Sequence, residues 1–127
     1  MVLALVVDDA CVERRRVREV VLGQGWAFSE AADGVEALLL IESLRPSCLI
    51  TDLAMPRMDG LALLRELIAR HIDIPTIVIT SDRQHETQAR CRHLGAIDVL
   101  PKPWEPARLI DLLANVRQML TNAGDDA

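Results

Sequence analysis

The chain has 127 residues and a formal net charge of −5, and its composition is 50% hydrophobic but only 2% aromatic. This length suits a single domain with an aliphatic core. The acidic balance and the shortage of aromatic rings argue against direct nucleic-acid binding through basic clusters or base stacking.

Short apolar runs alternate with amphipathic stretches from one end of the chain to the other. In chain order the pattern predicts a strand at 2–7, a helix at 11–22, a strand at 26–29, a helix at 34–44, a strand at 47–52, a helix at 60–70, a strand at 76–81, a helix at 83–96, a strand at 97–101 and a helix at 105–120. Because every connection between strands is helical, we expect a parallel sheet covered on both faces. The fold class is therefore α/β.

Several residues are expected to define the ends and faces of these elements. Asp33 is placed to cap the second helix, with Glu36 three positions later as in a capping box. Pro106 falls in the first turn of the last helix, where proline is favoured. The first helix has an apolar face of valines and a charged face predicted to carry Glu13, Arg14, Arg15, Arg16 and Arg18.

Charged and hydroxyl side chains stand where four of the strands end. Asp8 and Asp9 follow the first strand, Asp52 closes the third, Thr80 lies at the end of the fourth and Lys102 follows the fifth. In an open parallel sheet these ends share one rim, where ligands bind. Three adjacent carboxylates repel one another and need compensating positive charge. Lys102 supplies part of it, and Mg²⁺, which prefers oxygen ligands, would supply the rest. The set suits phosphoryl transfer.

These residues carry a resemblance to a known family over essentially the whole chain. The matching positions are Asp8-Asp9, Asp52 with the following "MPRMDG", Thr80-Ser81, Lys102-Pro103 and the stretch "AADGVEALLL". The sequence resembles the receiver domains of bacterial response regulators, with the chemotaxis response regulator as the nearest familiar type. The resemblance implies a flavodoxin-like three-layer sandwich with a five-stranded parallel sheet in the order 2-1-3-4-5 and five helices, over residues 1–121, with a short polar tail at 122–127.

The resemblance also implies a function in two-component signalling. Asp52 would be the phosphoacceptor, taking the phosphoryl group from a sensor histidine kinase or a histidine phosphotransfer protein. The implied Mg²⁺ ligands are Asp8, Asp9, Asp52 and the backbone carbonyl of Ala54. The domain would assist its own phosphorylation and dephosphorylation without being an enzyme for an external substrate.

Further roles follow from the same resemblance. Lys102 would pair with the phosphoryl oxygens, and the peptide bond before Pro103 is expected to be cis. Thr80 would move toward the phosphoryl group and report its presence. The family usually has Tyr or Phe three residues before the lysine, but this chain has Val99, which is stiff about χ1 and has no ring to turn. Either Thr80 acts through backbone movement or the switch is muted.

Some interpretations remain open on the sequence alone. The chain could be a receiver-like scaffold that is never phosphorylated, or an aspartyl-phosphate phosphohydrolase, although Ala54 stands where that class usually has a second Asp. Asp82 could orient a water or, as we favour, cap the fourth helix. The basic first helix is either a solvated surface or a docking site for the kinase. The domain is free-standing or part of a longer regulator, with homodimerisation through the fourth helix, fifth strand and fifth helix as an option.

The sequence also bears on the compartment. No apolar run approaches the ~20 residues of a membrane span, and no signal peptide is recognisable, so we expect a cytoplasmic protein without membrane association. Cys11, Cys48 and Cys91 share no metal-ligand spacing and are expected to be reduced, half-buried thiols. The three histidines, His71, His85 and His93, are expected on the surface.

Overall fold

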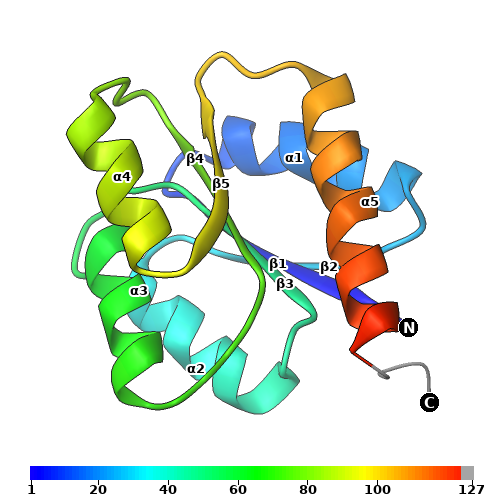
Figure 1. Ribbon diagram of the computed structural model, residues 1–127, viewed down its shortest axis with the longest axis horizontal. Helices are drawn as coiled ribbons and strands as arrows, with labels where there is room; N and C mark the ends of the chain where they lie inside the picture. The colour runs from blue at the N-terminus through cyan, green and yellow to red at the C-terminus, as the bar shows by residue number, and fades with distance from the viewer. Residues whose placement is uncertain (124–127) are drawn as a thin grey trace.

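The computed structural model describes residues 1–123 and contains five strands alternating with five helices (Figure 1). The strands are β1 (Leu3–Val7), β2 (Ala27–Ala31), β3 (Cys48–Thr51), β4 (Thr76–Thr80) and β5 (Ala96–Pro101). The helices are α1 (Cys11–Gly23), α2 (Gly34–Leu44), α3 (Gly60–Ala69), α4 (His85–His93) and α5 (Pro106–Asn122). The predicted boundary at residue 121 therefore falls in the last turn of α5, and residues 124–127 of the predicted tail lie outside the described residues.

Most elements lie within two residues of their predicted bounds, and the second strand and the fourth helix show why the bounds shift. The second strand begins after Trp26 and runs to Ala31, because it pairs along the full length of β1, from Leu3 opposite Ala27 onward. Trp26 instead lies in the core, 3% exposed. The fourth helix is shorter than predicted, since Ala96 joins β5 opposite Thr76.

All strand pairs are parallel, and the sheet has the order β2-β1-β3-β4-β5. This is the predicted 2-1-3-4-5 arrangement of the flavodoxin-like fold. The register places Val7 opposite Thr51 and Thr80 opposite Pro101. The ends of β1 and β3 are therefore level, whereas β4 and β5 run two residues further, because Thr51 lies opposite Val78. The residues after all four strands still reach one rim.

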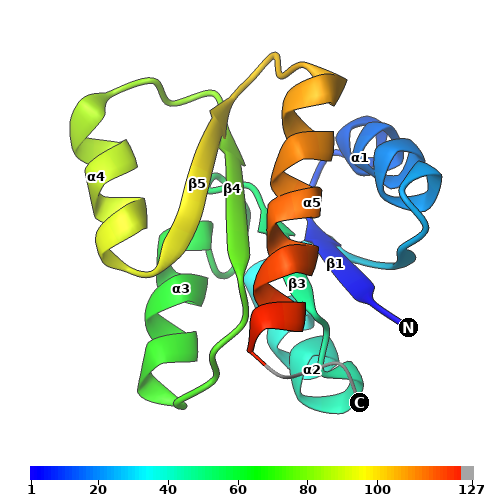
Figure 2. The same cartoon turned by 45° about the vertical axis from the view of Figure 1, so that its right-hand side comes forward.

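Helices cover the two faces of the sheet, with α1 and α5 on one side and α2, α3 and α4 on the other (Figures 1 and 2). In β1, Ala4 and Val6 belong to the core beneath α1 and α5, whereas Leu5 and Val7 belong to the core beneath α2 and α3. This alternation is the period of two that a strand imposes on its side chains. Both cores are mainly aliphatic, as the composition predicts, and the two buried rings, Trp26 and Trp104, lie in the core beneath α1 and α5.

The fourth helix is the least apolar of the five. Within its bounds Cys91 is the buried residue, and it packs with Val78, Ala96 and Val99 in a small cluster between α4 and the sheet. Val99 is 5% exposed, so the position of the missing aromatic ring is filled by a buried aliphatic side chain.

The prediction that the three cysteines are half-buried was wrong, because two are fully buried and one is exposed. Cys48 and Cys91 are fully buried and Cys11 is exposed, and all three are free thiols. Burial raises the pKa of the Cys48 thiol to about 12. The predicted surface positions of His71, His85 and His93 are confirmed. Within the described residues, no helix has the length and apolar character needed to span a membrane.

Candidate functional site

The backbone ladder of the sheet continues into the residues that follow the strands. The amide of Asp52 donates to the carbonyl of Val7 over 2.9 Å, and the amide of Lys102 donates to the carbonyl of Thr80 over 2.8 Å. Asp8 is likewise held by a 3.1 Å bond from its amide to the carbonyl of Ala31. The site residues are thus anchored by the rigid sheet rather than by mobile loops.

Three carboxylates meet at this rim. Asp8, Asp9 and Asp52 each place a carboxylate oxygen within 4.8 Å of the others. Asp8 and Asp52 are buried, 6% and 7% exposed, whereas Asp9 faces solvent. Lys102 Nζ lies 3.2 Å from Asp8 Oδ2 and 3.3 Å from Asp52 Oδ2. Ala54, two residues beyond Asp52, is exposed in the loop between β3 and α3.

The raised pKa of Asp52 indicates that Lys102 does not fully compensate this buried acid. Burial, followed by the charge of Asp8, raises the pKa of Asp52 above its ordinary value, although Lys102 and a hydrogen bond from the Leu53 amide oppose this. Burial would lower the pKa of Lys102, but Asp52 and Asp8 outweigh it and the net pKa is raised. The site therefore holds a surplus of negative charge, and its oxygen donors fit a hard divalent cation such as Mg²⁺.

Comparison with known proteins identifies the family of this fold and site. The family model described as the response regulator receiver domain matches residues 4–114. The chain is 40% identical over 125 residues to "Response regulator MprA" of Mycobacterium avium, covering 97% of this chain and 54% of that protein. The Mycobacterium bovis (strain BCG) protein of the same name is 40% identical over 116 residues, covering 91% and 49%. The chain thus spans about half the length of the curated relatives it matches.

This chain belongs to the response regulator receiver domain family. It is a receiver domain of two-component signalling. Solved structures agree with its fold. The receiver domain of the Francisella response regulator 1452 superposes with a TM-score of 0.87 at 27% identity, covering 94% of this chain and 99% of that one. The chemotaxis response regulator CheY4 of Vibrio cholerae gives 0.82 at 29% identity, covering 91% and 98%.

The receiver's loop after Asp52 is held from both sides by close backbone packing. A Cβ on Gly60 would lie 2.3 Å from the carbonyl oxygen of Asp52, and the Gly60 amide donates to the carbonyl of Leu53. Only glycine allows α3 to begin this close to the acidic residue's backbone. Asp59 caps the helix by accepting a 2.8 Å bond from the amide of Ala62.

The predicted cap Asp33 has a second contact that the sequence did not indicate. Its Oδ1 accepts from the amide of Glu36, as predicted, and the Glu36 carboxylate accepts from the amide of Ala32. Its Oδ2 accepts 2.8 Å bonds from Arg57, whose backbone is left-handed at φ 64°. The bond from the Glu36 amide and the pairing with Arg57 lower the pKa of Asp33. Asp33 thereby ties the loop after Asp52 to α2.

Thr80 is connected to the start of α4 through Asp82. Thr80 is 3% exposed, and its Oγ1 accepts a 3.1 Å bond from the amide of Asp82. The Asp82 carboxylate in turn accepts from the amide of Gln84 and from the hydroxyl of Thr87, and these bonds lower its pKa. The expectation that Asp82 caps α4 was therefore wrong, because the N-cap is Gln84 and has no side-chain cap bond. Asp82 lies two residues earlier and holds the start of the helix through Gln84 and Thr87.

The first helix contains two contacts that contradict its predicted solvated face. Arg14 is mostly buried, donating to the carbonyl of Asp8 and pairing with Glu30. Glu13 is also partly buried. These contacts depend on how α1 packs against the sheet, which the charge pattern of the helix alone does not predict. Arg15, Arg16 and Arg18 are exposed, as predicted.

The loop that carries Lys102 is also fixed from outside the sheet. Arg83 Nη2 donates a 3.0 Å bond to the carbonyl of Lys102, linking the β4–α4 loop to the β5–α5 loop. The peptide bond between Lys102 and Pro103 is cis, as predicted. Trp104 packs in the core beside α5.

Proposed function

We propose that this receiver domain accepts a phosphoryl group on Asp52 in a Mg²⁺-dependent reaction and acts as a conformational switch. One observation carries the proposal: Lys102 Nζ lies 3.2 and 3.3 Å from the buried carboxylates of Asp8 and Asp52, within a cluster of three acids. A carboxylate nucleophile, a set of oxygen ligands and an ammonium group thus occupy the same rim.

The proposed donor is a phosphohistidine of a sensor kinase or a histidine phosphotransfer protein. A carboxylate oxygen of Asp52 attacks phosphorus, and the P–N bond of the donor breaks as the O–P bond forms. The electron pair of the broken bond stays on the imidazole, which takes a proton from solvent. Lys102 pairs with the transferring oxygens. In a separate dephosphorylation step, water attacks phosphorus and the bond between phosphorus and the Asp52 oxygen breaks, which releases inorganic phosphate and restores the carboxylate.

The residues that would hold Mg²⁺ are Asp8, Asp9, Asp52 and the backbone carbonyl of Ala54. When bound, the ion neutralises charge on the phosphoryl oxygens. The raised pKa of Asp52 supports this assignment, because it reflects burial and repulsion from Asp8 that a cation would offset. Assisting its own phosphorylation and dephosphorylation in this way does not make the domain an enzyme for an external substrate.

The switch is proposed to act through the loop between β4 and α4. If the Thr80 hydroxyl turns toward a phosphoryl group, it gives up the bond from the Asp82 amide. Asp82 also holds the first turn of α4 through Gln84 and Thr87. This connection favours backbone movement over a muted switch, with Val99 as a passive part of the core.

The proposed partners are a histidine kinase or phosphotransfer protein and, as an option, a second copy of this chain. The face proposed for the homodimer is formed by α4, β5 and α5, and it carries Asp98 between Arg92 and Arg108 at 3.0 and 2.8 Å. The cytoplasm is the proposed compartment, in keeping with three free thiols.

Intact mass after incubation with acetyl phosphate and Mg²⁺ tests the proposal. We expect a single phosphoryl adduct on the unmodified chain and on the control Glu42→Gln, and none on Asp52→Asn. The scaffold alternative predicts no adduct on any of them. The phosphohydrolase alternative predicts continuous release of inorganic phosphate from added phosphate esters.

A further inference from the structure

An acid lies on the buried side of α1. Val17 and Val21 form the inward row of this helix, 4% and 0% exposed, and Glu13 occupies the preceding position of the same row. Its side chain is 19% exposed, and its Oε2 atom is buried. A buried carboxylate oxygen without a partner is costly, so this position calls for a hydrogen-bond donor.

A buried donor without a partner lies across from it. Trp104 is 6% exposed. Among residues 1–123, Glu13 Oε2 and Trp104 Nε1 are the buried side-chain oxygen and nitrogen atoms that lack a hydrogen-bond partner. Both residues line the same cavity of about 10 Å³, which Asp8 and Asp52 also border. The residues that carry the unpaired acceptor and the unpaired donor thus line one small space beside Asp8 and Asp52.

We propose that this cavity holds one ordered water molecule. The volume matches the space of about 10–15 Å³ that a water needs, and a buried water typically makes about three hydrogen bonds. Here the water accepts from the Trp104 indole N–H, donates to Glu13 Oε2 and donates to the carboxylate of Asp8 or Asp52. An unpaired indole N–H is a hydrogen-bond donor, which a water oxygen satisfies and a cation does not.

Arg16 encloses this bridge from the outer side. Its Nη1 lies 3.9 Å from Glu13 Oε2, beyond hydrogen-bonding distance, and its guanidinium carbon lies 5.5 Å from the centroid of the Trp104 ring. The guanidinium balances the charge of Glu13 but leaves its oxygen available to the water. The bridge thereby fastens the loop containing Trp104 to α1.

Fastening Trp104 has a consequence for the proposed reaction. Only Pro103 separates Trp104 from Lys102, whose ammonium contacts Asp8 and Asp52. Glu13 is therefore a positioning residue for Lys102, acting through the water and the indole. This step rests on the proposed phosphoacceptor function, whereas the water site itself does not.

The water is tested by NMR on the whole chain. Trp104→Phe assigns the indole N–H signal, since Trp26 is the other tryptophan. We expect a rotating-frame Overhauser effect between a long-lived water and the Trp104 N–H in the unmodified chain and in Glu13→Gln, which keeps an acceptor. Glu13→Leu should lose it, whereas Glu19→Leu on the exposed side of α1 should keep it. No water signal in the unmodified chain, or an unchanged signal in Glu13→Leu, overturns the proposal. A crystal structure with Glu13 bonded directly to Trp104 overturns it as well.

The positioning role is tested by the rate of Asp52 phosphorylation with acetyl phosphate. Glu13→Leu should react several-fold more slowly, with its thermal midpoint and Mg²⁺ affinity maintained, and Glu13→Gln should recover most of the rate. Equal rates for Glu13→Leu and the unmodified chain reject the positioning role. If the unmodified chain forms no adduct at all, the proposed function fails, and the NMR result still decides the water site.

Discussion

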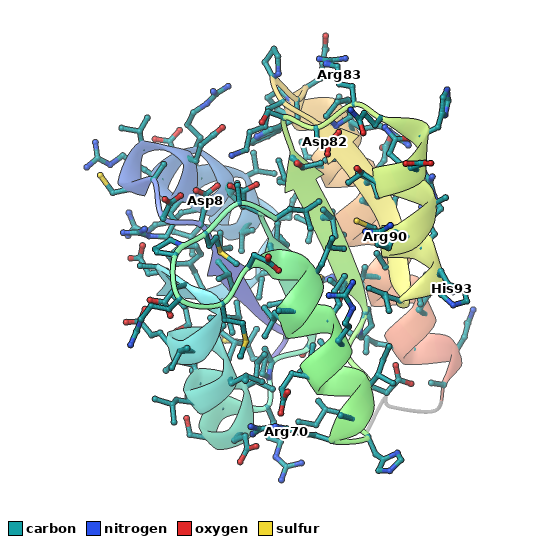
Figure 3. The ribbon with its side chains drawn as sticks, turned by 90° about the vertical axis from the view of Figure 1, so that its left-hand side faces the viewer. Asp8, Arg70, Asp82, Arg83, Arg90 and His93 are labelled. Carbon is teal, nitrogen blue, oxygen red and sulfur yellow. The ribbon has the colours of Figure 1, made fainter. Side chains whose placement is uncertain are left out.

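The amino and carboxyl ends of the sheet differ in the balance of charged side chains around them. At the amino ends of the strands, a cavity of about 650 Å³ is lined by Glu42, Arg45, Arg70 and Asp73 among others, two acids and two arginines. Arg70 pairs with both Glu42 and Glu66, and the three side chains are partly exposed. Figure 3 places Arg70 at this end and Asp8 and Asp82 toward the other.

At the carboxyl ends there is little open space, but the charges do not balance. Three carboxylates, two of them buried, face one lysine. The larger hollow is therefore at the end where the acids and arginines that line it are equal in number, and the candidate site is at the end where carboxylates outnumber the lysine. Uncompensated buried charge, rather than cavity size, marks the candidate functional rim of this receiver domain.

The comparison of the two ends predicts that the largest loss of stability follows a substitution at Gly60, where α3 begins beside Asp52. Gly60→Ala would place a methyl group 2.3 Å from the Asp52 carbonyl oxygen and 2.8 Å from the Leu53 Cα. Backbone atoms cannot yield as a flexible side chain would, so we expect a loss of about 3 kcal/mol or more in urea unfolding. Gly23→Ala meets no atom within 4 Å and should be close to neutral. Equal urea midpoints for Gly60→Ala and Gly23→Ala would refute the close packing of Gly60 against the backbone of Asp52 and Leu53.

The next effect concerns the rate of phosphorylation. Lys102→Met removes the ammonium that contacts Asp8 and Asp52, and we expect the reaction with acetyl phosphate to slow by about 10²-fold. Arg70→Met removes a cation at the opposite end and should leave the rate unchanged. A normal rate for Lys102→Met would show that this lysine does not serve the transfer.

A smaller effect is expected from relieving repulsion at the rim. Burial and Asp8 raise the pKa of Asp52 above its ordinary value of 3.8, so the folded state holds this proton to higher pH than the unfolded chain. Stability is then lost as the pH rises from the ordinary to the raised pKa. In a chelating buffer, Asp52→Asn should raise the thermal midpoint at neutral pH and give no gain below pH 3.8. An Asp52→Asn midpoint below that of the unmodified chain at neutral pH contradicts this.

The smallest effect on stability is expected at the amino ends of the strands, where acids and arginines balance. Arg70→Gln breaks two partly exposed ion pairs, which solvent and salt already screen. The thermal midpoint should change little, and less in high salt than in low salt. A large loss of stability in this variant would mean that the amino-end pairs matter more than their exposure indicates.

The sequence was sufficient for the fold and for the residues brought together at the rim. The carboxyl ends of parallel strands meet at one edge of the sheet, so the grouping of Asp8, Asp52 and Lys102 could be predicted from position alone. The strand signal was weakest at residues 26–29, because β2 is half-buried and its extent is set by pairing with β1 rather than by its own apolar content.

The contacts made by charged side chains around the site could not be predicted. Arg14 and Glu13 fall within a run that looks uniformly solvated, yet the packing of α1 against the sheet turns both inward. Arg57 and Arg83 reach partners 24 and 19 residues away, in loops whose courses depend on the folded structure. A charge pattern predicts only approximately which face of a helix is exposed, because long charged side chains can extend from that face to partners elsewhere.

Titration with Mg²⁺, followed through backbone amide shifts, tests the central claim most directly. If unbalanced charge defines the site, one ion should bind, the amides of Asp9, Asp52 and Leu53 should respond together, and Asp9→Asn should weaken the binding. The residues around the amino-end cavity should not respond. Either an absence of binding or a response centred on Glu42 and Asp73 would contradict the account.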